Sequence, residues 1–226
     1  MTPAPQTRIP SRFQAGWARI VAAILEHVYL STKVVGRANI PKQGAAILAG
    51  NHTGLVDGPI VLGASNRGVH FIMKWSLGQG FGGKILRAAG QVPLEKNGGR
   101  AALRTCLRLL EAGRLVGVFP EGSRGDGQMD KIHAGVAWLA VHAGAPIIPF
   151  ACLGTRRDGE AASHFPPFRR RLYVSFGPAL KLDLDKSAPT ADQIAAAMEQ
   201  IGPALADHVR EAVQASGIPL PKDKGR

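Results

Sequence analysis

Short apolar runs alternate with amphipathic stretches along most of the chain, a pattern typical of an α/β protein. Runs that fit strands lie at 33–36, 45–49, 69–73, 91–94, 115–118, 147–152 and 172–176, and helical spacing occurs at 58–64, 81–89, 100–111, 134–143 and from about residue 192. Because repeated strand–helix–strand units cross over with one hand, we expect a mixed, largely parallel sheet flanked by helices. This α/β domain is predicted to span residues 33–216.

A different pattern precedes the domain, between residues 12 and 32. Its apolar side chains are spaced by three and four and therefore share one face of an amphipathic helix. They are Phe13, Trp17, Ile20, Val21, Ile24, Leu25 and Val28. Such a helix lies in a membrane interface, with Trp17 as an anchor, or packs on the domain's own core. Periodicity alone favours packing on the core. Residues 1–11 are predicted to be a disordered tail, and 217–226 a flexible one.

Composition narrows the class of partner. Lys and Arg number 28 against 16 Asp and Glu, which gives a formal net charge of +12, while 45% of residues are hydrophobic. The chain is therefore not disordered, and its charge favours an anion: nucleic acid, a phosphate-bearing substrate or an anionic membrane surface. Two cysteines, Cys106 and Cys152, indicate a reducing compartment. We find no apolar signal-peptide core near the start and no apolar run long enough to span a membrane.

Polar residues follow four of the predicted strands at the point where each strand ends. They are Asn51-His52, Lys74, Glu95-Lys96, and Glu121 with Arg124. In open α/β sheets, ligands bind beyond the carboxyl ends of the strands. We therefore expect these groups to converge at one edge of the sheet.

The segment NHTGLVD, residues 51–57, contains a candidate catalytic pair. His52 precedes Asp57 by five positions, across a turn that enters a helix. A carboxylate that accepts a hydrogen bond from one imidazole nitrogen fixes the tautomer, so that the other nitrogen can take a proton. The alternative is a structural histidine beside an unrelated aspartate.

The segment FPEGSR, residues 119–124, indicates an anion site. Gly122 allows close approach of the backbone to a ligand, and the Arg124 guanidinium is a donor fork suited to phosphate. Glu121 is expected to hold that fork or to accept a substrate hydroxyl. The alternative is an ordinary turn with a surface ion pair.

Other chemistries lack their required residues. The glycine-rich stretch 78–84 resembles a nucleotide-binding loop, but Ile85 stands where the P-loop needs a hydroxyl. Ser123 is not in a G-x-S-x-G elbow, and the histidines and cysteines show no zinc spacing, so no metal is expected. Arg169–Arg171 fits a solvated basic loop better than a nucleic-acid reader.

Taken in order, NHTGLVD, Lys74, GQVPLEK, FPEGSR and APIIPF resemble the four-block pattern of the glycerolipid acyltransferases. Within that superfamily the chain is most similar to the 1-acylglycerol-3-phosphate acyltransferases, over about residues 34–155. The resemblance implies that His52 and Asp57 are the catalytic dyad. It implies an acceptor and phosphate site formed by Glu121, Gly122, Ser123, Arg124, Lys96 and Lys74. Lys96 stands where the third block usually ends in Arg, and His133 where the family often has Lys.

The resemblance also implies a reaction. A fatty acyl group passes from acyl-CoA or acyl carrier protein to the free hydroxyl of lysophosphatidic acid, giving phosphatidic acid in phospholipid biosynthesis. His52 is expected to act as general base without an acyl-enzyme, and no cofactor is needed. A lipid acceptor favours the membrane interpretation of residues 12–32, as a peripheral protein at the cytoplasmic face. Nucleic acid is then not expected as a partner.

Two alternatives stay open. One is the same chemistry on glycerol 3-phosphate, another lysolipid or another alcohol. The other is a non-catalytic basic module that binds membrane surfaces or nucleic acid.

Overall fold

A seven-stranded sheet forms the centre of the computed structural model, which describes residues 9–94 and 99–222. In spatial order the strands are β1 (Ser31–Val35), β7 (Arg171–Phe176), β6 (Ile147–Leu153), β2 (Ala46–Gly50), β5 (Leu115–Val118), β3 (Val69–Met73) and β4 (Val92–Pro93). Neighbouring strands pair in parallel except β6 and β7, which are antiparallel. The predicted mixed, largely parallel sheet is therefore confirmed.

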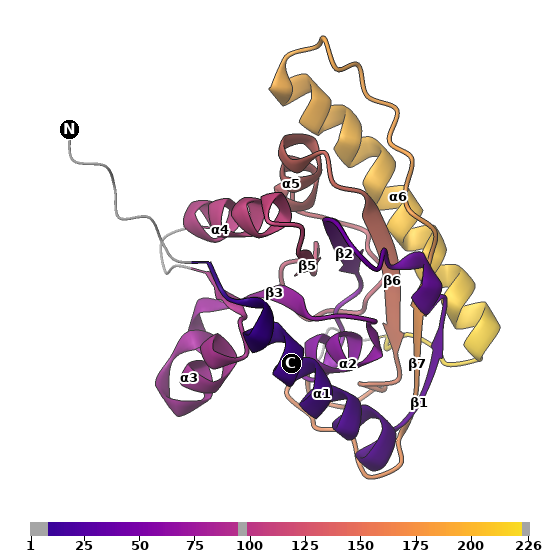
Figure 1. Cartoon of the computed structure of the whole chain (residues 1–226). Helices are drawn as coiled ribbons and strands as arrows, with labels where there is room; N and C mark the ends of the chain where they lie inside the picture. Colours follow the sequence, from indigo (N-terminus) through magenta and orange to yellow (C-terminus); the bar gives the residue numbers. More distant parts are fainter. Residues whose placement is uncertain (1–8, 95–98, 223–226) are drawn as a thin grey trace.

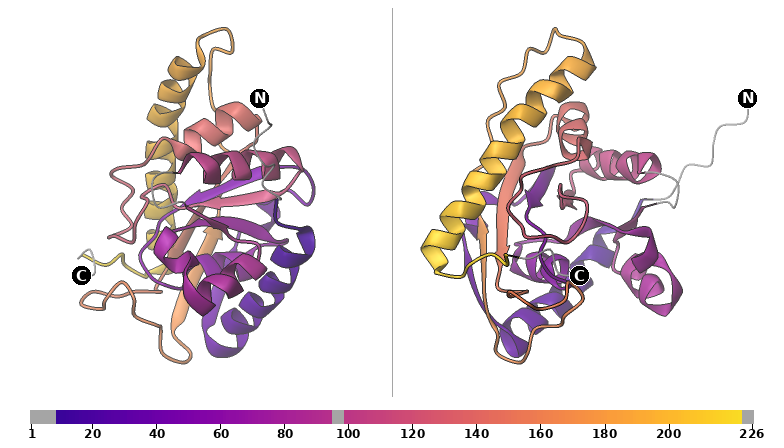
Figure 2. Two further views of the ribbon diagram at one scale, coloured as in Figure 1. Left: turned by 90° about the vertical axis from the view of Figure 1, so that its left-hand side faces the viewer. Right: turned by 180° about the vertical axis from the view of Figure 1, so that it is seen from behind.

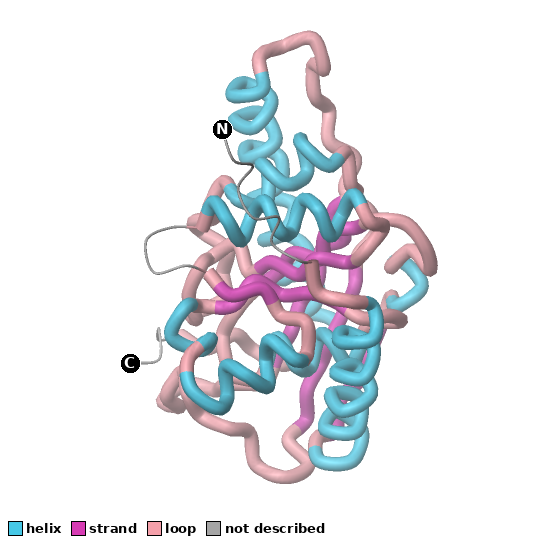
Figure 3. Tube along the Cα trace, turned by 60° about the vertical axis from the view of Figure 1, so that its left-hand side comes forward, coloured by secondary structure: helices cyan, strands magenta, loops and turns pink. Residues whose placement is uncertain are grey.

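Helices surround the strands, as Figure 3 shows. They are α1 (Arg12–Ile24), α2 (Asp57–Ala64), α3 (Gly80–Ala88), α4 (Arg100–Glu111), α5 (Gly135–Ala143) and α6 (Thr190–Ser216), with short helical turns η1 (Leu25–Tyr29), η2 (Arg37–Asn39) and η3 (Trp75–Gly78). In Figure 1, α4 and α5 lie above the strands and α1 and α2 below them. Figure 2 shows the long α6 running beside the sheet, where it packs on β6 and β7.

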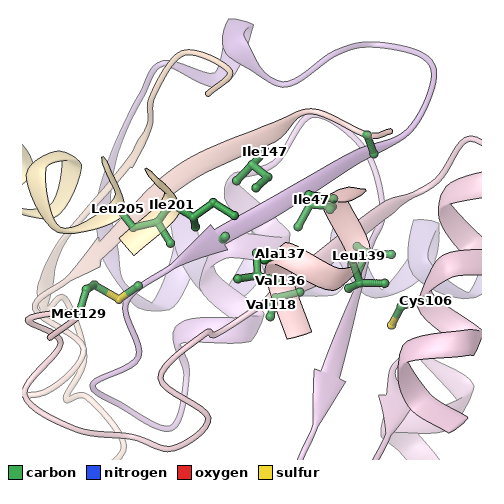
Figure 4. Packing of buried hydrophobic residues seen from close by; sticks show 14 of the residues in the cluster. Ile47, Cys106, Val118, Met129, Val136, Ala137, Leu139, Ile147, Ile201 and Leu205 are labelled. Carbon is green, nitrogen blue, oxygen red and sulfur yellow. The ribbon is translucent and has the colours of Figure 1, made fainter. Parts of the chain in front are cut away.

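Two apolar clusters form the core. One packs α4, α5 and α6 on the sheet through residues such as Ile47, Leu139 and Ile201, and Figure 4 shows part of it. The other packs α1 and α2 on the sheet through residues such as Ala22 and Ile60. Strand residues between these layers are buried on both sides, which explains why their sequences are continuous apolar runs.

Five of the seven large apolar side chains of the N-terminal helix lie outside, whereas Leu25 and the predicted anchor Trp17 are half-buried against the second cluster. The helix begins at a capping box in which Ser11 and Gln14 bond each other's main-chain N–H. Small residues face α2, and a Cβ on Gly63 of α2 would lie 2.8 Å from the main chain of Ala22, so only glycine allows this close packing. The exposed fractions of the large side chains are 79% for Phe13, 57% for Ile20, 56% for Val21, 56% for Ile24 and 64% for Val28.

The outer face of α1, which we define as these five residues including Val28 of η1, is therefore not covered by any described part of the chain. The helix continues through η1 to Tyr29, and β1 begins at Ser31. The strand thus starts two residues before the predicted position 33. No helix within the described ranges is both long and apolar enough to cross a membrane.

Candidate active site

Four adjacent parallel strands, β2, β5, β3 and β4, end at the same edge of the sheet. The chain that leaves β2 is fixed there by Asn51. Its side-chain Oδ1 accepts the N–H of Cys152 at 2.8 Å, and its Nδ2 donates to the Cys152 carbonyl at 3.0 Å. These two bonds continue the β2–β6 pairing beyond Gly50 and so fix the position of the backbone that leads into His52.

His52 and Asp57 lie in direct contact. Nδ1 of His52 is 2.8 Å from Oδ2 of Asp57, and Asp57 is wholly buried while the His52 side chain is 19% exposed. A carboxylate only accepts hydrogen bonds, so Nδ1 carries the proton and Nε2 is the nitrogen that can take another. The five-residue spacing thus brings the pair together, because the chain folds back at the start of α2.

The Asp57 carboxylate is held by several donors. Oδ2 accepts the main-chain N–H groups of Thr53 at 2.7 Å and Gly54 at 2.8 Å, and Oδ1 accepts the hydroxyl of Thr155. Donors on both oxygens fix the plane of the carboxylate. Asp57 also begins α2, where the helix dipole favours a negative charge.

Aromatic rings support the His52 imidazole. It stacks on Phe119 with ring centroids 4.0 Å apart and planes inclined by 18°. Phe119 in turn stacks on Phe71 at 5.2 Å and meets Phe150 edge-on at 5.7 Å. Phe119 packs against the α1–α2 cluster, so the imidazole is anchored on the same side of the sheet as α1.

Glu121 touches the backbone of His52. Its Oε2 accepts the His52 N–H at 2.8 Å, and the carboxylate also accepts the N–H of Met129. Burial raises the pKa of Glu121. Among the described residues Glu121 forms no ion pair with Arg124, whose Nη1 donates to the Ala162 carbonyl at 2.6 Å.

The end of the FPEGSR loop is partly open to solvent. Gly122 has a φ of 69°, and a Cβ there would lie 2.6 Å from Cδ2 of His133, so the turn requires glycine. Gly122 and Ser123 are exposed, and Arg124 is half-buried. This loop therefore presents main chain, a hydroxyl and a guanidinium beside the dyad.

Of the two lysines predicted for the site, the structure describes only Lys74. Lys74 follows β3 directly and is exposed at the start of η3. Lys96 lies outside the described residues. The positive charge expected from these lysines stays a prediction.

Sequence reasoning missed two residues that follow β6. Thr155, wholly buried, supports Asp57, and Arg156, 1% exposed, donates to carbonyls of three loops. No motif marked them; the only signal is that they follow a strand that ends at this edge.

Both cysteines are buried, and burial raises the pKa of Cys106 to about 12 and that of Cys152 well above its usual range.

A groove of about 860 Å³ lies elsewhere, between residues 128–133 and α6. It is lined by Met129, Ile132, Met198, Ala206 and Leu220 among others, and borders the FPEGSR loop through His133. Its walls do not include the loop that carries His52.

The chain is similar to known proteins in its sequence. The family model described as Acyltransferase matches residues 31–153, more than half of the chain. The chain is 30% identical over 132 residues to the 1-acyl-sn-glycerol-3-phosphate acyltransferase of Bacillus subtilis (strain 168), a match that covers 57% of this chain and 65% of that protein. It is 27% identical over 157 residues to the chloroplastic 1-acyl-sn-glycerol-3-phosphate acyltransferase BAT2 of Brassica napus, covering 66% of this chain and 44% of that protein. The matches thus span less than two thirds of these relatives.

The fold also has a known counterpart. The crystal structure of the 1-acyl-sn-glycerophosphate (LPA) acyltransferase PlsC from Thermotoga maritima is similar with a TM-score of 0.63 and 23% identity, covering 90% of this chain and 78% of that one. At this identity the likeness concerns the fold. The family match contains the His52–Asp57 pair and the Phe119–Arg124 loop, and the chain therefore belongs to the acyltransferase family.

Proposed function

We propose that this protein transfers a fatty acyl group from acyl-CoA or acyl carrier protein to the free hydroxyl of 1-acylglycerol 3-phosphate, giving phosphatidic acid. The observation that carries the proposal is the 2.8 Å contact between His52 and Asp57 at the carboxyl edge of the sheet. The names of the curated relatives support the choice of acceptor. Glycerol 3-phosphate or another lysolipid or alcohol is the alternative acceptor for the same chemistry.

The proposed mechanism uses His52 as a general base. Nε2 takes the proton of the acceptor hydroxyl as its oxygen attacks the thioester carbonyl carbon. The carbon–sulfur bond then breaks, and the imidazolium returns the proton to the leaving thiolate. The new ester and the free thiol account for every atom, so the enzyme ends the cycle unchanged.

Direct transfer requires no acyl-enzyme. A cysteine nucleophile acts as its thiolate, and the raised pKa values of Cys106 and Cys152 oppose that form. Both thiols are also buried. These properties support attack by the acceptor itself.

We assign the acceptor phosphate to the FPEGSR loop. Arg124 offers guanidinium donors, and Gly122 and Ser123 expose main-chain and hydroxyl groups beside the dyad. Lys74 and Lys96 would add charge from the neighbouring strands. Glu121 would contribute mainly by holding the backbone of His52 and Met129 and not by binding the phosphate.

We further propose that the protein works as a peripheral enzyme on an anionic membrane surface. The first half of α1 lies against the end of α3, because Trp17 Nε1 donates to the Ala88 carbonyl at 3.2 Å and Gln14 Nε2 donates to the Arg87 carbonyl at 3.3 Å. On the α3 side the exposed apolar residues are Leu77, Phe81 and Ile85, spaced by four, with exposed fractions of 42%, 79% and 46%. The basic residues Arg12, Lys84 and Arg87 are exposed on the same helices.

Binding to a membrane through α1 and α3 would suit the proposed reaction. The α1–α2 cluster carries Phe119 and, through it, the His52 imidazole. Apolar side chains entering the interface and basic residues meeting anionic head groups would place the dyad near its lipid acceptor.

The direct test is an assay of the purified chain with anionic vesicles and an acyl-CoA panel. Lysophosphatidic acid, glycerol 3-phosphate and an uncharged monoacylglycerol serve as acceptors, and acyl carrier protein as a second donor. We expect the fastest transfer to lysophosphatidic acid. No transfer to any acceptor from either donor would refute the proposed function, and preference for glycerol 3-phosphate would select the alternative.

A further inference from the structure

Thr155 and Arg156, to which the sequence assigned no role, donate hydrogen bonds to residues of the candidate site. They follow β6 after Gly154, and both are almost entirely buried, with 0% and 1% exposure. Among the described residues, the hydrogen bonds of their side chains that are given below join the two loops that carry the site motifs and the loop that they begin.

Thr155 bonds the oxygen of Asp57 that His52 does not use. Its hydroxyl donates to Oδ1, whereas Oδ2 faces Nδ1 of His52 and two main-chain N–H groups. Its Oγ1 also lies 3.3 Å from the hydroxyl of Thr53. A donor on Oδ1 resists rotation of the carboxylate, and that rotation would move Oδ2 away from the imidazole.

Arg156 connects the two motif loops. Its Nε donates to the Thr53 carbonyl at 2.9 Å and its Nη2 to the Gly125 carbonyl at 2.8 Å, while Nη1 reaches the Glu160 carbonyl at 3.2 Å. The loops are also joined directly, since the Gly125 N–H donates to the His52 carbonyl at 2.8 Å. A planar fork suits such divergent acceptors, and a lysine ammonium does not reproduce it.

We propose that Thr155 and Arg156 are positioning residues of the transfer reaction: Thr155 orients Asp57, and Arg156 holds the His52 loop in register with the FPEGSR loop. Neither touches the reacting atoms. A displacement of about 1 Å at a reacting group costs up to about 100-fold in rate. Losing either residue should therefore lower kcat and leave the KM for the acceptor nearly unchanged. This inference rests on the proposed function.

The test for Thr155 compares variants that lose or keep the hydroxyl. Thr155→Val removes the donor and should lower kcat about 10- to 100-fold, whereas Thr155→Ser keeps the hydroxyl and should stay within about threefold. Thr105→Val on α4, which removes a hydroxyl bonded to the Ala101 carbonyl, is the matched control and should keep full kcat. Full kcat in a folded Thr155→Val protein would overturn the role of Thr155. If valine prevents folding, Thr155→Cys keeps a weak S–H donor and must fall below serine in kcat for the role to stand.

The test for Arg156 separates positioning from phosphate binding. Arg156→Lys keeps the charge and should lower kcat about tenfold with little change in KM; a raised KM with normal kcat would mean that Arg156 binds substrate. Arg67→Lys is the control, because Arg67 likewise bridges the carbonyls of Lys42, Gly44 and Gly113, but at the amino ends of the strands. It should lower the melting temperature and leave kcat unchanged.

A readout without substrate separates this inference from the proposed function. The Nδ1–H proton resonance of His52, seen by NMR, should shift or broaden in Thr155→Val and return in Thr155→Ser. An inactive wild type with this shift would refute the function alone, and an active wild type without any shift or kcat loss would refute the positioning role alone.

Discussion

The carboxylate of Glu121 accepts the main-chain N–H of His52 at 2.8 Å, which joins the loop after β5 to the residue proposed as the base. The same carboxylate accepts the N–H of Met129, a residue with a φ of 65°. Non-glycine residues at positive φ are strained and occur often at functional sites. Glu121 therefore has a bracing contact that its motif alone does not show.

Bracing predicts a particular kinetic effect. Glu121→Ala should lower kcat about 10- to 100-fold, because the backbone of His52 loses its acceptor, with little change in the KM for lysophosphatidic acid. Glu121→Gln keeps one acceptor oxygen and should retain more kcat than alanine. Steady-state kinetics over acceptor concentration make the measurement. A rise in KM alone would return Glu121 to the acceptor site.

Arg124 should act on the phosphate instead. Arg124→Ala should raise the KM for lysophosphatidic acid about tenfold or more and leave the KM for an uncharged monoacylglycerol unchanged, because only the first acceptor carries the anion. Arg104→Ala, which removes an exposed arginine of α4, is the control. Equal effects on both acceptors would contradict phosphate binding by Arg124.

Membrane binding should depend on α1 and α3 together. The double variant Ile20→Glu with Phe81→Glu places two charges on apolar side chains that are 57% and 79% exposed. Burying one such side chain contributes about 1.5–3 kcal/mol, so the fraction bound to anionic vesicles should fall at least about tenfold. Vesicle flotation measures that fraction. Ala195→Glu, at an exposed site of α6, should still float, and undiminished binding of the double variant would refute the proposed surface.

Stability should depend on the protonation of Glu26 in η1. Glu26 is wholly buried, and neither of its oxygens has a hydrogen-bond partner among the described residues. Burial raises the pKa of Glu26 from 4.5 to about 7, against the opposing effects of Arg37 and Arg19. The folded state thus keeps a proton that the unfolded chain releases near pH 4.5.

The contribution of Glu26 to the free energy of unfolding should therefore fall by about 3 kcal/mol as the pH rises from about 4.5 to 7. Glu26→Gln should remove that slope and stabilise the protein at pH 8. Urea unfolding at several pH values checks it. Glu160→Gln is the control: the Arg170 hydrogen bond lowers the pKa of Glu160 to about 2, so its contribution is lost only in acid. An unchanged slope in Glu26→Gln would contradict the assignment.

Sequence reasoning located the strands because buried parallel strands are continuous apolar runs, as in β2 and β6. It offered His52 and Asp57 as a candidate pair across a short turn, and the resemblance to the acyltransferases implied that they are the dyad. It did not tell which side of α1 faces the domain: periodicity groups the large side chains, but the small alanines pack against α2 at Gly63. Nor did it find Thr155 and Arg156, because their contacts join segments about 100 residues apart.

The most direct test of the account is the turnover of His52→Ala with acyl-CoA and lysophosphatidic acid on anionic vesicles. We expect the fold of this variant to stay intact, because Thr53, Gly54 and Thr155 still hold the buried Asp57 carboxylate, and circular dichroism checks it. We predict that kcat falls by at least about 10²–10⁴-fold, the scale of a lost general base, while vesicle binding is unchanged. Near-normal turnover in this variant would contradict the proposed mechanism.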